Sequence, residues 1–183
     1  IMREEIEIPK KILQEAKTMA VGILVVGDPM QATTHIDLES YCEEENIEFH
    51  LIPGISATSL AVSLSGMQSY RFGRQITLPY SFGDYLPTSP LEIYLKNYDF
   101  GLHTLMLLDL DPTGMGLEKP KPMQPKEVLV LLEKIVMKYI ESNDFNALLN
   151  TSVKDWRGIL LSDLGGTDQQ IFAGTLGELS KIE

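Results

Sequence analysis

The sequence predicts an α/β fold with two α/β subdomains and a cleft between them. Short apolar runs alternate with helical patterns over the first 70 residues, an order typical of a mainly parallel sheet. Aromatic, strand-like segments with longer connections follow, so we expect a boundary within residues 66–75 and subdomains at 1–70 and 71–183. With 183 residues and 44% hydrophobic content, the chain can bury one good core or two small ones.

The first subdomain is expected to alternate helices with two strands. The expected elements are helix 8–18, strand 21–26, helix 33–45, strand 49–52 and helix 55–64. Pro9 suits a first helical turn, Thr33 or Thr34 suits a helix cap, and Gly66 suits a helix end. The third helix is rich in small side chains, which permits close packing against a sheet or a ligand.

The second subdomain is expected to continue this alternation with a larger core helix. The expected elements are strand 75–79, helix 88–98, strand 103–110, helix 124–139, strands 158–164 and 170–173, and helix 175–182 with Thr175 as cap. The inward side chains of the amphipathic helix 124–139 are Val128, Leu131, Leu132, Ile135 and Val136. The Pro- and Gly-containing tract 111–122 is predicted to be a mobile loop.

Composition excludes several classes of function. The formal net charge of −11 argues against sequence-independent binding to nucleic acid or to an anionic membrane. No apolar run reaches the length of a membrane span. The one cysteine, Cys42, excludes an intramolecular disulfide and favours a reducing, cytoplasmic compartment. Its acidic neighbours would raise the pKa of the thiol, so we expect no catalytic role for it.

The most informative segment runs from Val25 to His35. An apolar run ends at Gly27-Asp28-Pro29, and a helical pattern begins almost at once. Ligands of α/β proteins bind at the carboxyl ends of strands. A carboxylate fixed there suits a cationic or hydroxyl-rich small molecule better than a phosphate, which is typically bound by Gly-rich amides and a Lys. The segment therefore predicts a cofactor site in a chain with neither a P-loop nor a GxGxxG motif.

This segment carries a family resemblance. Gly27-Asp28-Pro29 resembles the Gly-Asp-Pro loop of the tetrapyrrole methylase superfamily, the class III S-adenosylmethionine-dependent methyltransferases. The longer run from Gly27 to Leu38 resembles the diphthine synthases, especially the archaeal ones. Further segments that agree, in order, are 52–56, 70–74 with 77–79, 87–90 and 101–109. The resemblance covers essentially the whole chain and is densest over residues 21–110.

The resemblance implies an activity and its partners. Members are two-domain homodimers that use S-adenosyl-L-methionine, release S-adenosyl-L-homocysteine and need no metal. They methylate the amino group of a modified histidine on translation elongation factor 2, in diphthamide biosynthesis. Carried onto this sequence, the resemblance and the local pattern together give six cofactor-binding candidates: Asp28, Gln31, Ser56, Ala57, Leu107 and Leu164.

Five of the six candidates also have a structural reading. Asp28 could bond only the amides of its own turn. Ser56 and Ala57 could serve helix capping and packing, and Leu107 and Leu164 could be core residues. No catalytic residue is assigned, because methyl transfer relies mainly on positioning and desolvation and needs only a neutral amine.

Other chemistry-bearing residues are assigned more general roles. His35, His50 and His103 share no metal-like spacing, and His35 could be structural or could approach the substrate. Arg71 and Arg74 could meet the elongation factor or form surface ion pairs. The aromatic residues Tyr80, Phe82 and Tyr85 could wall the target side chain or pack the second subdomain.

Three departures from the family pattern keep other functions open. The chain has no counterpart of the family's opening Gly-rich strand and loop or of its closing Pro-Pro-His segment, so we expect it to be incomplete. Pro53-Gly54 stands where the family usually has His-Gly. A small-molecule methyltransferase acting on a corrin or another tetrapyrrole, and a non-catalytic interaction protein, therefore remain alternatives.

Overall fold

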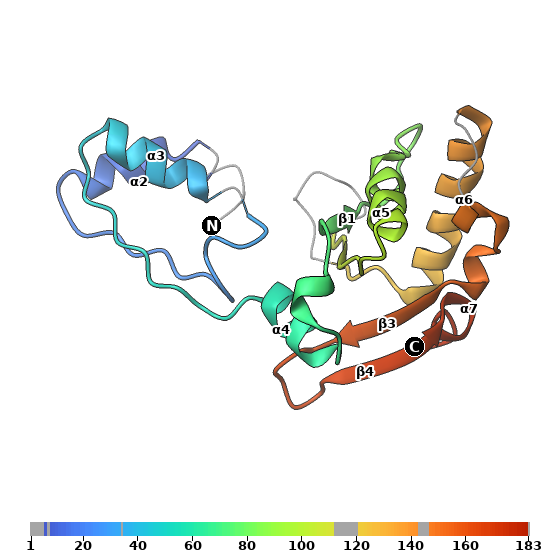
Figure 1. The fold of residues 1–183 in the computed structure, drawn as a ribbon. Helices are drawn as coiled ribbons and strands as arrows, with labels where there is room; N and C mark the ends of the chain where they lie inside the picture. Colours follow the sequence, from blue (N-terminus) through green and yellow to red (C-terminus); the bar gives the residue numbers. More distant parts are fainter. Residues whose placement is uncertain (1–5, 7, 34, 112–120, 143–146, 183) are drawn as a thin grey trace. The chain divides into compact units, whose positions relative to one another are not determined.

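The computed structural model describes residues 6, 8–33, 35–111, 121–142 and 147–182. The chain divides into two compact units, Ile1–Ser59 and Leu60–Glu183 (Figure 1). This division falls between Ser59 and Leu60, whereas the sequence places a subdomain boundary after residue 70. The subdomain boundary stays a prediction. Most of the tract 111–122, expected to be a mobile loop, lies outside the described residues.

Two helices, α2 (Lys10–Ala16) and α3 (Ile36–Glu44), lie wholly within the described part of the first unit. Both confirm expected helices, although each is shorter than predicted. They lie side by side (Figure 1), and an ion pair between Lys17 and Glu45 joins their carboxyl-terminal ends. On α3, Leu38 and Cys42 are buried.

The prediction of two strands in the first unit is wrong. Neither 21–26 nor 49–52 is a strand in the structure, and the side chains of Leu24 and Val26 are fully exposed. An apolar run by itself does not make a strand, because a strand also needs a neighbouring backbone that accepts and donates hydrogen bonds. Within the described residues, no hydrogen-bonded ladder partner lies beside either segment.

Helix α4 (Ala57–Leu64) is found where the third helix was expected, two residues shorter at its start. Gly66 follows it with a φ of +74°, the left-handed conformation that commonly ends a helix.

The second unit contains every helix and strand expected of it, with shifted ends. The elements are η1 (Ser69–Arg71), β1 (Ile76–Leu78), α5 (Ser89–Asp99), β2 (Met106–Leu108), α6 (Pro125–Ser142), η2 (Ala147–Asn150), η3 (Val153–Asp155), β3 (Arg157–Ser162), β4 (Gln170–Thr175) and α7 (Leu176–Leu179). Strands β1 and β2 pair in parallel, with α5 as the connection between them. Strands β3 and β4 pair antiparallel, because a short turn joins them directly. The expectation of a mainly parallel sheet therefore holds for only one of the two described pairs.

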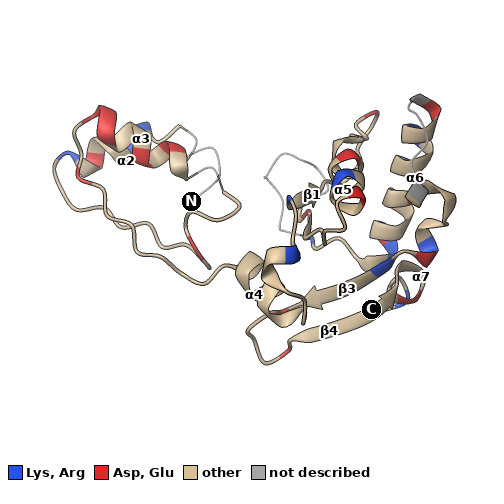
Figure 2. Cartoon of the chain, viewed as in Figure 1, with Lys and Arg blue, Asp and Glu red and all other residues tan. Residues whose placement is uncertain are grey.

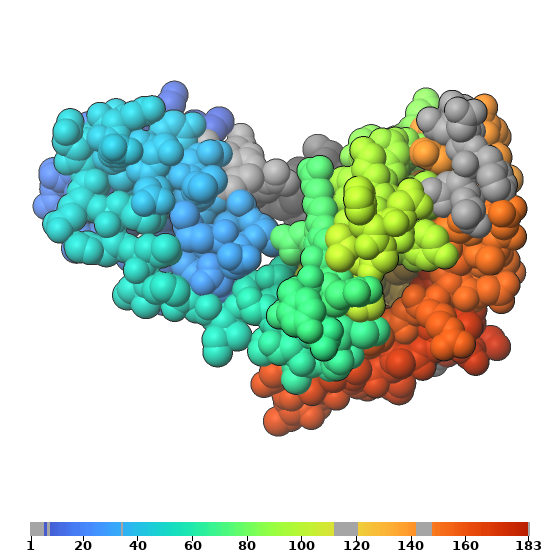
Figure 3. Space-filling view, viewed as in Figure 1, coloured from blue at the N-terminus to red at the C-terminus, as the bar shows by residue number. Residues whose placement is uncertain are grey.

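The core of the second unit forms where α5, α6 and β1 meet. Leu78, Leu91 and Ile135 are fully buried there, and Tyr94 stacks on Trp156 with ring centroids 5.2 Å apart. Side chains of α5 pack against the segment that carries β1, as the space-filling view shows (Figure 3). The face of α6 predicted to point inward is confirmed: Leu131, Leu132, Ile135 and Val136 are buried and Val128 is partly buried against the same core.

Helix α7 begins with the expected cap. The Thr175 side chain accepts a hydrogen bond from the Glu178 backbone N–H, and the Glu178 carboxylate accepts one from the Thr175 N–H. The hydrogen bonds that the Glu178 carboxylate accepts from the Thr175 N–H and hydroxyl lower the pKa of Glu178. The helix ends at Leu179 rather than at Ile182. Among the described helices, none is long and apolar enough to cross a membrane.

Asn97 joins three segments of the second unit. Its side chain, on α5, is buried and donates to the Arg74 carbonyl oxygen at 2.8 Å and to Thr104 Oγ1 at 2.9 Å. Its Oδ1 atom accepts from the Arg74 N–H at 3.1 Å. One amide therefore links the start of β1, helix α5 and the segment that leads into β2.

We predict that Asn97→Ala lowers the free energy of unfolding by about 1–3 kcal/mol, because it removes a buried side chain with three hydrogen bonds. Urea denaturation measures the change. Lys96→Ala, on the exposed face of the same helix, is the control and should cost less than about 0.5 kcal/mol. Equal losses in the two variants would contradict the role assigned to Asn97.

Cys42 provides a second prediction. The thiol is buried, and burial raises its pKa; the acidic neighbours invoked from the sequence are not the cause. We expect iodoacetamide to alkylate Cys42 slowly in the folded protein at pH 7 and rapidly in urea, because only the exposed thiolate reacts. Mass spectrometry over time measures both rates, and rapid alkylation of the folded protein would contradict this burial.

Candidate functional site

The Gly27-Asp28-Pro29 turn forms the centre of the candidate site. Gly27 has a φ of +88°, a left-handed backbone conformation that favours glycine. The Asp28 side chain is half-buried: Oδ1 accepts a hydrogen bond from the Met30 N–H at 2.9 Å, and Oδ2 accepts one from the Gly54 N–H at 3.0 Å. The carboxylate thus bonds within its own turn, as the structural reading expected, and also joins it to the Pro53-Gly54 turn.

Gln31 and His35 follow this turn. The Gln31 side chain is exposed, and the backbone N–H of Gln31 donates to the Asp28 carbonyl oxygen at 3.4 Å. Nδ1 of His35 lies 2.7 Å from the carbonyl oxygen of Pro29. Because a carbonyl oxygen only accepts, Nδ1 carries the proton and donates to the turn. This bond favours the structural reading of His35 over an approach to substrate.

Ser56 and Ala57 lie at the start of α4. Ser56 is buried, and its hydroxyl oxygen accepts from the Thr58 N–H at 3.2 Å and lies 2.9 Å from Thr58 Oγ1. Ser56 therefore caps helix α4, which is the structural role that the sequence also allowed for it. Ala57 is exposed and presents a small side chain beside this cap.

Leu107 and Leu164 belong to the second unit. Leu107 is half-buried at the centre of β2, opposite Thr77 of β1. Leu164 is half-buried in the turn after β3, immediately before Gly165, whose φ is +81°. A Cβ atom at Gly165 would lie 3.3 Å from Leu60 Cδ1, so this turn packs against α4.

Four of the six candidate residues lie in the first unit and two lie in the second. Asp28 and Gln31 share one turn, and the hydrogen bond to Gly54 brings the segment before Ser56 and Ala57 to it. Leu107 and Leu164 lie in the other unit, and their placement relative to the first four stays a prediction. Sequence reasoning missed Gly54, because no local pattern indicates a partner 26 positions from Asp28.

Acidic side chains are also frequent elsewhere in the first unit. Figure 2 shows them along α3 and just beyond it; they are Asp37, Glu39, Glu43, Glu44 and Glu45. With Asp28, they give this unit a negative field that suits a cationic ligand such as a sulfonium or an ammonium group.

The aromatic residues of the second unit divide into two sets. The Tyr80 hydroxyl donates to the Lys121 carbonyl oxygen at 3.1 Å and lies 3.5 Å from a Glu127 oxygen; burial and Glu127 raise its pKa. Phe82 and Tyr85 stack on each other at 4.8 Å and remain about half exposed. Tyr80 therefore packs the subdomain, whereas Phe82 and Tyr85 present an aromatic surface.

His103 and Arg71 are tied to neighbouring segments. The His103 ring packs edge-on against Phe72 with centroids 5.5 Å apart, which is a structural contact. The Arg71 guanidinium donates to the Gly101 carbonyl oxygen at 2.8 Å. Within the described part of the chain, no group of three or more His, Cys, Asp or Glu side chains is arranged to hold a metal ion.

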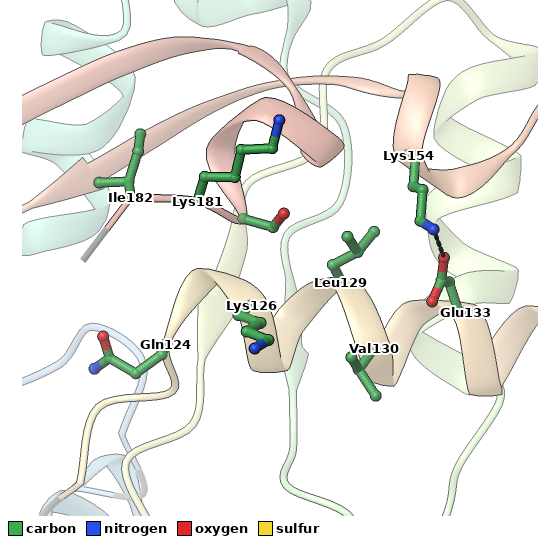
Figure 4. Close-up of a pocket in the computed structure, with 9 residues that line it drawn as sticks. Gln124, Lys126, Leu129, Val130, Glu133, Lys154, Lys181 and Ile182 are labelled. Atoms are coloured by element: carbon green, nitrogen blue, oxygen red, sulfur yellow. Dashed lines mark ion pairs between the residues drawn. The ribbon is translucent and has the colours of Figure 1, made fainter.

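A groove of about 620 Å³ lies elsewhere in the second unit, between α6 and the segment after α7 (Figure 4). Its lining includes Lys126, Lys154 and Lys181, and Lys154 pairs with Glu133 at 3.7 Å. None of the six candidate residues lines it. Its cationic lining suits an anion, so the groove does not match the chemistry expected of a sulfonium site.

Comparison with known proteins identifies relatives. Residues 2–180 match the family model of the tetrapyrrole (corrin/porphyrin) methylases. Diphthine synthase of Methanocorpusculum labreanum is 37% identical over 135 residues, covering 73% of this chain and 52% of that protein. Diphthine synthase of Halorubrum lacusprofundi is 32% identical over 178 residues, covering 96% of this chain and 62% of that protein. The chain thus spans 52–62% of the length of these two relatives.

A solved structure of a similar protein has the same fold. The crystal structure of a diphthine synthase from Entamoeba histolytica, described as putative, superposes with a TM-score of 0.79 at 28% identity, covering 94% of this chain and 64% of that one. The α/β fold expected of class III methyltransferases is therefore confirmed. The chain belongs to the tetrapyrrole (corrin/porphyrin) methylase family.

Proposed function

We propose that this protein is an S-adenosylmethionine-dependent methyltransferase of the diphthine synthase type. In this proposal it methylates the amino group of the modified histidine of translation elongation factor 2. The observation that carries it is the Gly27-Asp28-Pro29 turn, with a half-buried carboxylate held by two backbone amides, in a chain similar to several diphthine synthases.

The chemistry of the turn fits the cofactor. A carboxylate has about four lone-pair positions, and one on each oxygen of Asp28 is used by a backbone amide. The remaining positions can accept hydrogen bonds from hydroxyl or ammonium groups of S-adenosylmethionine. Gln31, the small Ala57 and the backbone around Ser56 would complete this half of the site, and Leu107 and Leu164 would pack on the adenosine.

The bound cofactor would supply an electrophilic methyl group on a sulfonium. Transfer of that methyl group to the amine would release S-adenosylhomocysteine, with the proton of the alkylated nitrogen passing to solvent. The protein's part is to orient the two reactants and to keep the amine neutral by excluding water.

The remaining parts of the proposal concern partners and location. The protein would act in the cytoplasm as a homodimer, with elongation factor 2 as its protein substrate. Arg74, which is exposed, and the half-exposed Phe82 and Tyr85 would be available to an acidic, bulky partner surface.

A second candidate function is methylation of a corrin or another tetrapyrrole. The family description, which names corrin and porphyrin methylases, favours it. The diphthine synthase names of the relatives favour the protein substrate.

We predict that S-adenosylhomocysteine binds the protein in a calorimetric titration and that Asp28→Ala weakens binding at least about tenfold, because it removes the carboxylate. Asp37→Ala, which removes an exposed carboxylate from α3, is the control and should change the affinity less than about twofold. No detectable binding to the unaltered protein would defeat the cofactor proposal.

We further predict methyl transfer from labelled S-adenosylmethionine to elongation factor 2 that bears the unmethylated histidine adduct. Elongation factor 2 without the adduct should stay unlabelled, since it lacks the acceptor amine. Labelling of a precorrin instead of the elongation factor would support the second candidate and reject the first.

A further inference from the structure

The Asp28 turn is held from two sides by residues of its own unit. On one side, the Gly54 N–H donates to Asp28 Oδ2 at 3.0 Å. On the other side, Nδ1 of His35 donates to the Pro29 carbonyl oxygen at 2.7 Å. A third bond, from the Met30 N–H to Oδ1 at 2.9 Å, sets the direction of the carboxylate within the turn. The carboxylate therefore has one orientation before any ligand binds.

Gly54 allows this arrangement because it has no side chain. A Cβ atom there would overlap the Gly27 carbonyl oxygen and would lie 2.9 Å from the carbonyl carbon. Both atoms are backbone atoms, which cannot turn aside as the end of a side chain can. Gly54 does not have a positive φ, so the requirement is for space rather than for an unusual backbone conformation.

Any larger residue at position 54 must therefore move the two turns apart. That movement lengthens or breaks the bond from the Gly54 N–H to Asp28 and frees the carboxylate to rotate. A carboxylate that must first be ordered binds a ligand more weakly than one already in place.

We propose that Gly54 is a positioning residue for the cofactor, acting through Asp28 rather than by touching the ligand itself. This inference rests on the proposed function, since it takes the Asp28 turn as part of the S-adenosylmethionine site. It assigns to the Pro53-Gly54 turn the task of setting the carboxylate's direction.

Gly54→Ala tests the proposal, with Gly22→Ala as the matched control. Gly22 lies in the same unit, has no positive φ, and an added Cβ atom there would meet nothing within 4 Å. In calorimetric titrations with S-adenosylhomocysteine, Gly54→Ala should bind at least about tenfold more weakly than the unaltered protein. Gly22→Ala should bind within about twofold of it.

The double variant Gly54→Ala with Asp28→Ala distinguishes a positioning role of Gly54 from a general disturbance of the fold. If Gly54 acts through Asp28, Gly54→Ala should cause no further loss of affinity in a protein that already carries Asp28→Ala. A further loss of about tenfold in that background would mean that position 54 acts independently of the carboxylate, and would overturn the proposal.

A measurement without ligand keeps the test valid even if Gly54→Ala does not fold. In the free, unaltered protein, the Gly54 amide proton should resonate downfield because it bonds a carboxylate. Nuclear magnetic resonance should show it moving upfield in Asp28→Ala, while the Gly22 amide stays in place. An unmoved Gly54 amide would overturn the proposal.

The two levels of failure can be told apart. If the unaltered protein binds S-adenosylhomocysteine and Gly54→Ala binds within about twofold of it, only the positioning role is overturned. If the unaltered protein does not bind, the proposed function is overturned, and the role of Gly54 in cofactor binding with it.

Discussion

The candidate site depends on the hydrogen bonds that the Asp28 carboxylate accepts from two backbone amides. One amide comes from its own turn and the other from Gly54, so the carboxylate both shapes a turn and joins two segments that are distant in sequence. Such bonds to an ionised acceptor are stronger than those between neutral groups. They also leave lone pairs free, so a structural role and a ligand-binding role are compatible in the same side chain.

In the second unit, Asn97 links segments in a similar way with a neutral side chain. Its amide satisfies both backbone groups of Arg74 and the Thr104 hydroxyl, at the start of a parallel strand pair that is three residues long on each side. So short a pair has few ladder hydrogen bonds, and the buried amide adds to them. In both units a single polar side chain thus bonds segments that are distant in sequence, and in the second unit these bonds add to the backbone pairing already present there.

Much of the second unit could be predicted from the sequence. The inward face of α6 follows from the spacing of its apolar residues, and the α7 cap follows from Thr175 and Glu178. The strands expected at 21–26 and 49–52 were wrong, because an apolar run does not by itself supply the hydrogen-bonding neighbour that a strand needs. For Cys42, the direction of the pKa shift was predicted, but its cause is burial on α3 rather than the neighbouring charges.

For the site, the turn around Asp28 could be predicted, because its residues are adjacent in the chain. The role of Gly54 could not, because it depends on a close approach between backbone atoms of distant segments. The most direct test of the account is a crystal structure of the protein with S-adenosylhomocysteine. The account predicts a polar group of the ligand within hydrogen-bond distance of the Asp28 carboxylate, with the Gly54 N–H still donating to it. Ligand bound away from this turn, for example in the lysine-lined groove beside α6, would contradict it.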